Sequence, residues 1–180
     1  MIMNYNECLD QYGNSYQINK MLESGCIFKI EEGIYSENKY ASDVVILSKK
    51  YPHAVFSGAY AMYYHGLTEF IPDSYTLATK SKAAPITDKR VEQVYIRDEI
   101  LLLGATKVAI EGVDVLMYDK ERLLIELLRN KSKWPRDFYK EVIGHYRRII
   151  DSLEIWRIQD YIDNFPKGKM IRRAFDEEVL

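Results

Sequence analysis

Residues 14–35 read NSYQINKMLESGCIFKIEEGIY, and this stretch decides the interpretation of the fold. Asn14-Ser15 offers an N-cap for a helix over residues 16–24, because their side-chain oxygens can accept hydrogen bonds from free backbone N–H groups. Ile18, Met21 and Leu22 share one face of this helix, and Gly25 is suited to end it. The pattern therefore predicts an amphipathic helix with a well-defined start and end.

The ten residues after this helix predict a small β-hairpin. They form two pieces rich in β-branched and aromatic residues around a Glu-Glu-Gly turn at residues 31–33. On the other side of the helix, residues 5–12 read as a shorter helix that ends at Gly13. The order helix, helix, hairpin is that of the second half of a winged helix-turn-helix, so residues 1–38 are predicted to be a truncated winged-helix module.

The rest of the chain predicts a larger α+β domain over residues 39–180. The polar connection at residues 36–40 marks the boundary. We expect two helices and then four strands up to residue 118, with a tight hairpin turn at Glu111-Gly112 in a small, mostly antiparallel sheet. Helices are predicted over residues 42–51 and 57–65, and strands over 74–79, 91–96, 106–110 and 113–118. The pattern then becomes helical to the end, with helices near 120–130, 135–150, 153–164 and 169–178.

In a winged helix-turn-helix, the second helix of the motif reads bases in the major groove and the hairpin touches the backbone. Asn and Gln suit contacts to adenine, and Tyr, Ser and Lys suit contacts to phosphate. The candidate DNA-binding residues are Asn14, Ser15, Tyr16, Gln17, Asn19, Lys20 and Lys29. Residues 1–40 nevertheless hold three Lys against six Asp and Glu, so weak binding by a single copy, or a packing module without DNA binding, are both open.

Positive charge is concentrated in the C-terminal half instead. Residues 119–148 carry nine Lys and Arg against five Asp and Glu, a local net charge of +4 in a chain of net charge −2. An acidic protein, a nucleic acid or a nucleotide would each suit such a face, and a simply solvated helix surface is the alternative. The candidate basic face consists of Arg129, Lys133, Arg136, Lys140, Arg147 and Arg148.

Composition and motifs argue against several classes of function. With 47% hydrophobic and 29% charged residues, the chain is predicted to be ordered, and with no apolar run of membrane-spanning length and no signal peptide it is predicted to be cytoplasmic. Three scattered His and two Cys (Cys8 and Cys26, expected to be buried) provide no metal-ligand spacing. No nucleotide-binding loop or nucleophile motif occurs, so we expect no catalytic residue, no metal, no cofactor and no enzyme activity.

Three segments together resemble a known family. The helix and hairpin of residues 17–35 are similar to the opening of AbiEi-type antitoxins, and residues 51–68, ending in His65-Gly66-Leu67-Thr68, are similar to that family's Ser-Ala…His-Gly-Leu helix. Residues 115–129, with Tyr118-Asp119-Lys120-Glu121-Arg122, resemble its Tyr-Asp-x-Glu-Arg segment. These segments occur in the family's order and spacing, although only two helices precede the hairpin where the family usually has three.

The resemblance implies an antitoxin of a bacterial toxin–antitoxin pair that acts in abortive phage infection. Its partner would be a nucleotidyltransferase-like toxin, opposed without a stable complex in the type IV scheme. The N-terminal winged helix would bind inverted repeats in promoter DNA and repress the operon, and the C-terminal domain would carry the antitoxin activity. A protein-interaction antitoxin that has lost DNA binding and acts through its basic helical face is the alternative.

Overall fold

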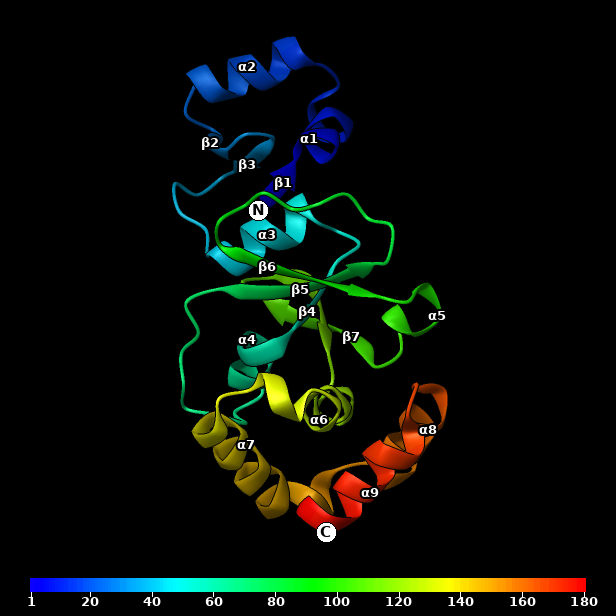
Figure 1. Ribbon diagram of the computed structural model, residues 1–180. Helices are drawn as coiled ribbons and strands as arrows, with labels where there is room; N and C mark the ends of the chain where they lie inside the picture. The colour runs from blue at the N-terminus through cyan, green and yellow to red at the C-terminus, as the bar shows by residue number, and fades with distance from the viewer. The chain divides into compact units, whose positions relative to one another are not determined.

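The computed structural model describes residues 1–180 and shows a mixed α+β protein (Figure 1). Its contacts divide the chain into two compact units. Unit 1 comprises residues 1–53 and 107–116, and unit 2 comprises residues 54–106 and 117–180. The division after residue 38, expected from the sequence, remains a prediction. None of the helices combines the length and the apolar character that a membrane span requires.

Unit 1 contains the helix, helix and hairpin expected from the sequence, with one additional strand. Its strands form an antiparallel sheet of order β1-β3-β2, in which Ile2 and Phe28 both pair with Ser36. Strand β1 was not expected, because three residues are too few to show an alternating pattern. The elements of this unit are β1 (Ile2–Asn4), α1 (Tyr5–Tyr12), α2 (Ser15–Glu23), β2 (Phe28–Glu31), β3 (Ile34–Ser36) and α3 (Asp43–Lys50).

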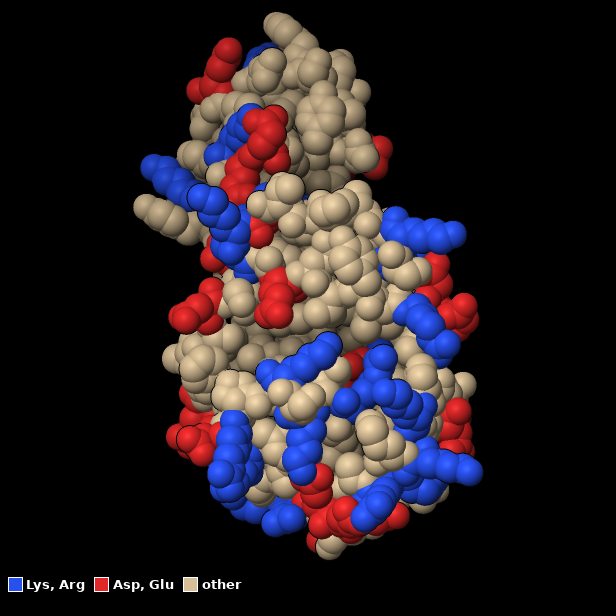
Figure 2. All heavy atoms as spheres, viewed as in Figure 1, with Lys and Arg blue, Asp and Glu red and all other residues tan.

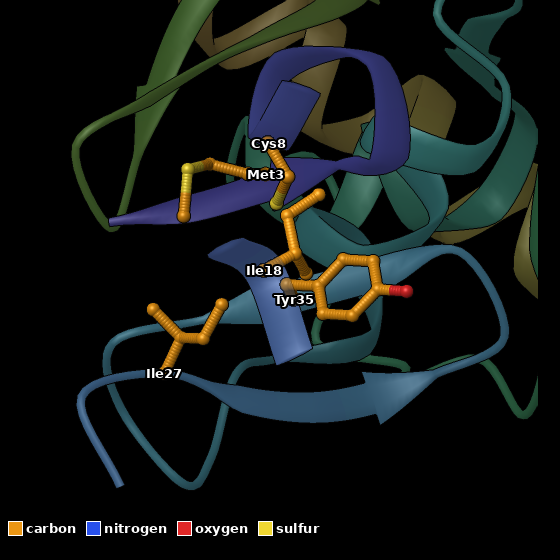
Figure 3. Packing of buried hydrophobic residues seen from close by; sticks show 5 residues of the cluster. All are labelled: Met3, Cys8, Ile18, Ile27 and Tyr35. Atoms are coloured by element: carbon orange, nitrogen blue, oxygen red, sulfur yellow. The ribbon is translucent and has the colours of Figure 1, made fainter. Parts of the chain in front are cut away.

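A small apolar core joins these elements. Side chains from β1, α1, α2, β3 and the segment before β2 meet in it: Met3, Cys8, Ile18, Tyr35 and Ile27 (Figure 3). Cys8 is fully buried, as expected. The same expectation for Cys26 is wrong, since this residue is exposed in the turn after α2.

The second sheet of the protein has the strand order β6-β5-β4-β8-β7, with β4 in the middle. Strand β4 is antiparallel to β5 and parallel to β8, while β5 and β6 are parallel to each other. The sheet is therefore mixed, and the expectation of a mostly antiparallel sheet is wrong. Its strands are β4 (Val55–Ser57), β5 (Tyr75–Lys80), β6 (Val91–Ile96), β7 (Ala105–Ile110) and β8 (Val113–Tyr118), of which residues 107–116 belong to unit 1.

Two local features explain this difference. Strand β4 is only three residues long and directly precedes a helix, so it is too short to show an alternating pattern in the sequence. Parallel neighbours need a long connection, and residues 81–90 provide it between β5 and β6. The side chain of Gln93 holds this loop, since it accepts a hydrogen bond from Ile86 N at 2.7 Å and donates to Ala84 O at 3.1 Å.

The helices of unit 2 agree with the expected segments apart from α5, a single turn that was not expected. Helix α6 lies at the centre of the helical part, and α8 and α9 pack on it and on each other (Figure 1). It is buried on nearly every side, because its residues 121–128 all lie in the core. The helices are α4 (Gly58–Tyr64), α5 (Asp98–Leu101), α6 (Lys120–Arg129), α7 (Arg136–Ile149), α8 (Ile155–Asn164) and α9 (Gly168–Glu178).

Candidate nucleic-acid interface

Helix α2 is held in unit 1 by its cap and by one packed face. Asn14 is the N-cap residue, and its Oδ1 accepts a hydrogen bond from Gln17 N at 3.0 Å. Ile18 is buried in the core of unit 1, and Met21 and Leu22 pack against that core while remaining partly exposed. The helix is therefore fixed on one side only, and its opposite side is open to solvent.

The candidate DNA-binding side chains gather on this open side. Tyr16 is the most prominent, with 72% of its surface exposed. One turn of helix brings Asn19 and Lys20 beside it, since residues three and four apart share a face. The exposed candidates of this segment are Asn14, Ser15, Tyr16, Gln17, Asn19 and Lys20.

Glu23 also lies on this face, although it was not among the candidates. It is exposed and stands three residues after Lys20 and four after Asn19. A carboxylate at this place repels phosphate but can accept a hydrogen bond from the amino group of cytosine. Its helical spacing from Asn19 and Lys20 was the signal in the sequence that points to it.

Most cations of unit 1 are paired with carboxylates of the same unit. Lys29 of β2, a candidate phosphate contact, lies 2.5 Å from Glu32, and this pair together with its hydrogen bond raises the pKa of the lysine. Lys49 likewise pairs with Glu7, at 2.7 Å. Lys20, in contrast, has no ion pair or hydrogen bond through its side chain, so it is the cation that α2 presents to solvent.

Replacing Asn14 with alanine is expected to lower the free energy of unfolding by about 1 kcal/mol, since the first turn of α2 loses its side-chain cap. Thermal or urea unfolding measures this loss. Asn6→Ala serves as the control, because Asn6 is exposed on α1 and caps no helix. Equal effects of the two substitutions would show that the cap contributes nothing.

The candidate basic face divides into engaged and free side chains. Arg147 Nε donates to Glu178 O at 2.7 Å, and Arg129 is partly buried, with its Nη1 3.9 Å from Glu126 Oε2. Four exposed cations have no such partner: Lys133, Arg136, Lys140 and Arg148. Figure 2 shows Lys and Arg side chains gathered over the helical part of unit 2, where α6 to α9 lie in Figure 1.

The Tyr-Asp-Lys-Glu-Arg segment at the start of α6 forms a buried polar network. Arg122 is fully buried, and its Nη1 donates to the carbonyl oxygens of Ile100 at 2.7 Å and Leu103 at 2.9 Å. Its Nη2 donates to Glu126 Oε1 at 2.9 Å. The rings of Tyr118 and Phe165 each lie 4.3 Å from its Cζ. All donors of this guanidinium point into the protein interior, so Arg122 serves packing and not recognition.

The carboxylates of the same segment connect α6 to α8. Asp119 caps α6 through Oδ1, which accepts from Arg122 N, while its Oδ2 accepts from Tyr161 Oη at 2.7 Å. Burial raises the pKa of the Asp119 carboxyl, and these hydrogen bonds oppose that effect. Glu121 Oε1 accepts from Glu154 N at 3.0 Å. Both carboxylates therefore hold helices together.

His65 has a structural position as well. It caps the end of α4, and its Nε2 lies 2.9 Å from the carbonyl oxygen of Tyr118. Burial lowers the pKa of its imidazole, which favours a neutral ring that donates to this carbonyl. No three His, Cys, Asp or Glu side chains cluster in a way that could hold a metal ion.

Comparison with known proteins identifies a similar fold. No protein-family model matches the chain, and no curated protein has a significantly similar sequence. Among solved structures, it is similar to the crystal structure of the RV2827C protein from Mycobacterium tuberculosis, with a TM-score of 0.59 and 12% sequence identity. The similarity covers 99% of this chain and 72% of that one. At this identity the comparison shows a shared fold and nothing about activity.

Proposed function

We propose that this chain is a DNA-binding antitoxin whose N-terminal module is a truncated winged helix-turn-helix that binds duplex DNA through α2. The observation that carries the proposal is the exposed polar face of this helix. It presents Tyr16, Gln17, Asn19 and Lys20 to solvent on a helix held by Ile18 and followed by a β-hairpin. Such a helix can enter a major groove without any rearrangement of the core.

The charges of unit 1 indicate how such binding would work. A module whose free cation on α2 is Lys20 gains little from phosphate neutralisation, so one copy would bind weakly. Two copies on an inverted repeat would double the contacts, and the base contacts of Gln17 and Asn19 would supply specificity. Promoter DNA with inverted repeats is the corresponding target, as the resemblance to AbiEi-type antitoxins implies.

Binding to the region upstream of the chain's own gene tests this proposal. Gln17→Ala is expected to weaken binding to an inverted-repeat duplex by about 1–3 kcal/mol, because one base contact is lost. Fluorescence anisotropy across a salt series measures the change. Gln159→Ala is the matched control, since Gln159 is an exposed glutamine of α8 in unit 2. Absence of binding by the unmodified chain even at low salt would refute the proposal.

The antitoxin role is tested separately, in cells. The expected toxin is a nucleotidyltransferase-like protein encoded beside this gene, which would inhibit growth when it is expressed alone. Co-expression of the present chain is expected to restore that growth. Alanine variants of the exposed cations Lys133, Arg136, Lys140 and Arg148 then measure whether the basic face contributes, as the protein-interaction alternative requires. Growth inhibition that persists with the unmodified chain would contradict this role.

A further inference from the structure

Three cations of α7 form a ridge along the helix, which we call the α7 ridge: Arg136, Lys140 and Arg148. They stand at positions i, i+4 and i+12, with Gly144 at i+8. Four residues advance the helix by slightly more than one turn, so these positions form a row that winds slowly around the helix. The row extends about 18 Å along the helix axis. Nη1 of Arg148 lies 4.0 Å from where a Cβ of Gly144 would stand, so the Arg148 side chain passes beside Gly144.

The charges of the ridge are not neutralised within the protein. Other cations of the helical part pair with carboxylates: Lys131 with Glu178 at 2.8 Å, and Arg172 with Asp163 at 2.8 Å. The three ridge residues are exposed and have no ion pair, and the neighbouring Lys133 is equally free.

Two acidic residues of α7 stand near the ridge and could reduce its net positive charge. Glu141 is engaged elsewhere, because its Oε1 accepts from Thr68 Oγ1 at 2.8 Å and from Glu69 N at 2.9 Å. These bonds lower the pKa of its carboxyl. Asp137 is exposed and subtracts one charge from the ridge. The ridge therefore retains a net positive charge in a chain whose overall charge is −2.

The composition of the ridge distinguishes between two kinds of anionic partner. Protein interfaces need an apolar centre that excludes water around their charged contacts. The large apolar side chains of α7 turn inward, as with Tyr139, Val142 and Tyr146, and none stands on the ridge. Phe138 packs against Phe70 on another side of the helix. Contacts to a phosphodiester backbone need cations alone, and arginine binds phosphate oxygens in a bidentate manner.

We propose that the α7 ridge binds the phosphodiester backbone of a nucleic acid without reading its sequence. This surface is separate from the α2 face and independent of the operator binding proposed above. It would bring the C-terminal half of the protein to nucleic acid by charge alone, so the affinity would depend steeply on salt.

The test uses a fluorescein-labelled duplex of about 20 base pairs that contains no inverted repeat. Four cations, the ridge with Lys133, predict a salt slope of about −3.6, so the affinity of the unmodified chain falls about 150-fold between 50 and 200 mM salt. The triple variant Arg136→Gln, Lys140→Gln, Arg148→Gln retains one of these cations, and its affinity is expected to fall only about fourfold over the same range.

A matched control separates the ridge from net charge. The triple variant Lys80→Gln, Lys82→Gln, Lys89→Gln removes the same number of exposed, unpaired cations from unit 2 outside α7 and is expected to bind like the unmodified chain. The absence of an inverted repeat from the duplex keeps the result separate from operator recognition. Circular dichroism verifies that both triple variants are folded.

Three outcomes would overturn the proposal. The first is that the unmodified chain fails to bind the duplex at 50 mM salt. The second is that the control triple variant loses as much affinity as the ridge variant. The third is that poly-L-glutamate displaces the duplex at equal concentration of charge, which would assign the ridge to an acidic protein.

Discussion

Replacing Arg122 with alanine is expected to lower the free energy of unfolding by about 3–5 kcal/mol. The substitution removes a fully buried guanidinium and leaves Glu126 without its closest cation. The carbonyl oxygens of Ile100 and Leu103 lose their donor at the same time. Glu126 and the carbonyl oxygen of Ile100 then stay buried with fewer partners, and a buried polar group that loses its hydrogen bond destabilises the folded state.

Urea unfolding measures this loss in the free energy of unfolding, and two further variants are compared with Arg122→Ala. Arg172→Ala removes an arginine from an exposed ion pair with Asp163 and is expected to cost at most about 1 kcal/mol. Arg122→Lys keeps the charge but loses the planar fork that serves several acceptors, so an intermediate loss is expected. If Arg122→Ala is as mild as Arg172→Ala, the buried network does not hold unit 2 together.

Replacing Gly104 with alanine is expected to cost about 2–5 kcal/mol, for two separate reasons. The backbone of Gly104 has φ +76°, a left-handed conformation that costs a residue with a Cβ about 1–2 kcal/mol. The added Cβ would also stand 2.5 Å from Cβ of Arg122, and forcing such an overlap costs about another 1–3 kcal/mol. Arg122 cannot move away easily, because its guanidinium is held by hydrogen bonds to Ile100, Leu103 and Glu126.

Gly66→Ala separates these two contributions, since Gly66 has a similar φ of +69° but no atom within 4 Å of the added Cβ. It is expected to show the conformational cost alone. Shortening Arg122 to alanine does not relieve the overlap at Gly104, because the nearest atom is Cβ, which alanine retains. Equal losses for Gly104→Ala and Gly66→Ala in the same unfolding measurement would exclude the close contact.

Much of the secondary structure could be predicted because its signals are local. Asn14 and Asp119 cap their helices through their own side chains, and glycines with positive φ, such as Gly25, follow helix ends. The face of α2 could be predicted in the same way, from the helical spacing of Ile18, Met21 and Leu22. Such signals depend on neighbours along the chain and need no knowledge of the fold.

The candidate sites could be predicted from the sequence only in part. The exposed polar positions of α2 follow from its periodicity alone. The sequence could not show that Lys29 is paired with Glu32, because a turn decides whether their side chains meet. It could not divide the basic face either, because Arg147 is engaged by the backbone of Glu178, a distant residue, while Arg148 is not.

By itself, the sequence determined where every helix except α5 lies in the chain and which side of α2 faces solvent, since caps, glycines and apolar spacing act over a few residues. The tertiary structure alone decided that β4 is the central strand and that β5 and β6 run in parallel. It also decided that Arg122 is fully buried, with its guanidinium hydrogen-bonded inside the protein. The reason is physical: strand pairing and the desolvation of a charge depend on groups that lie far apart in the chain and come together only when it folds.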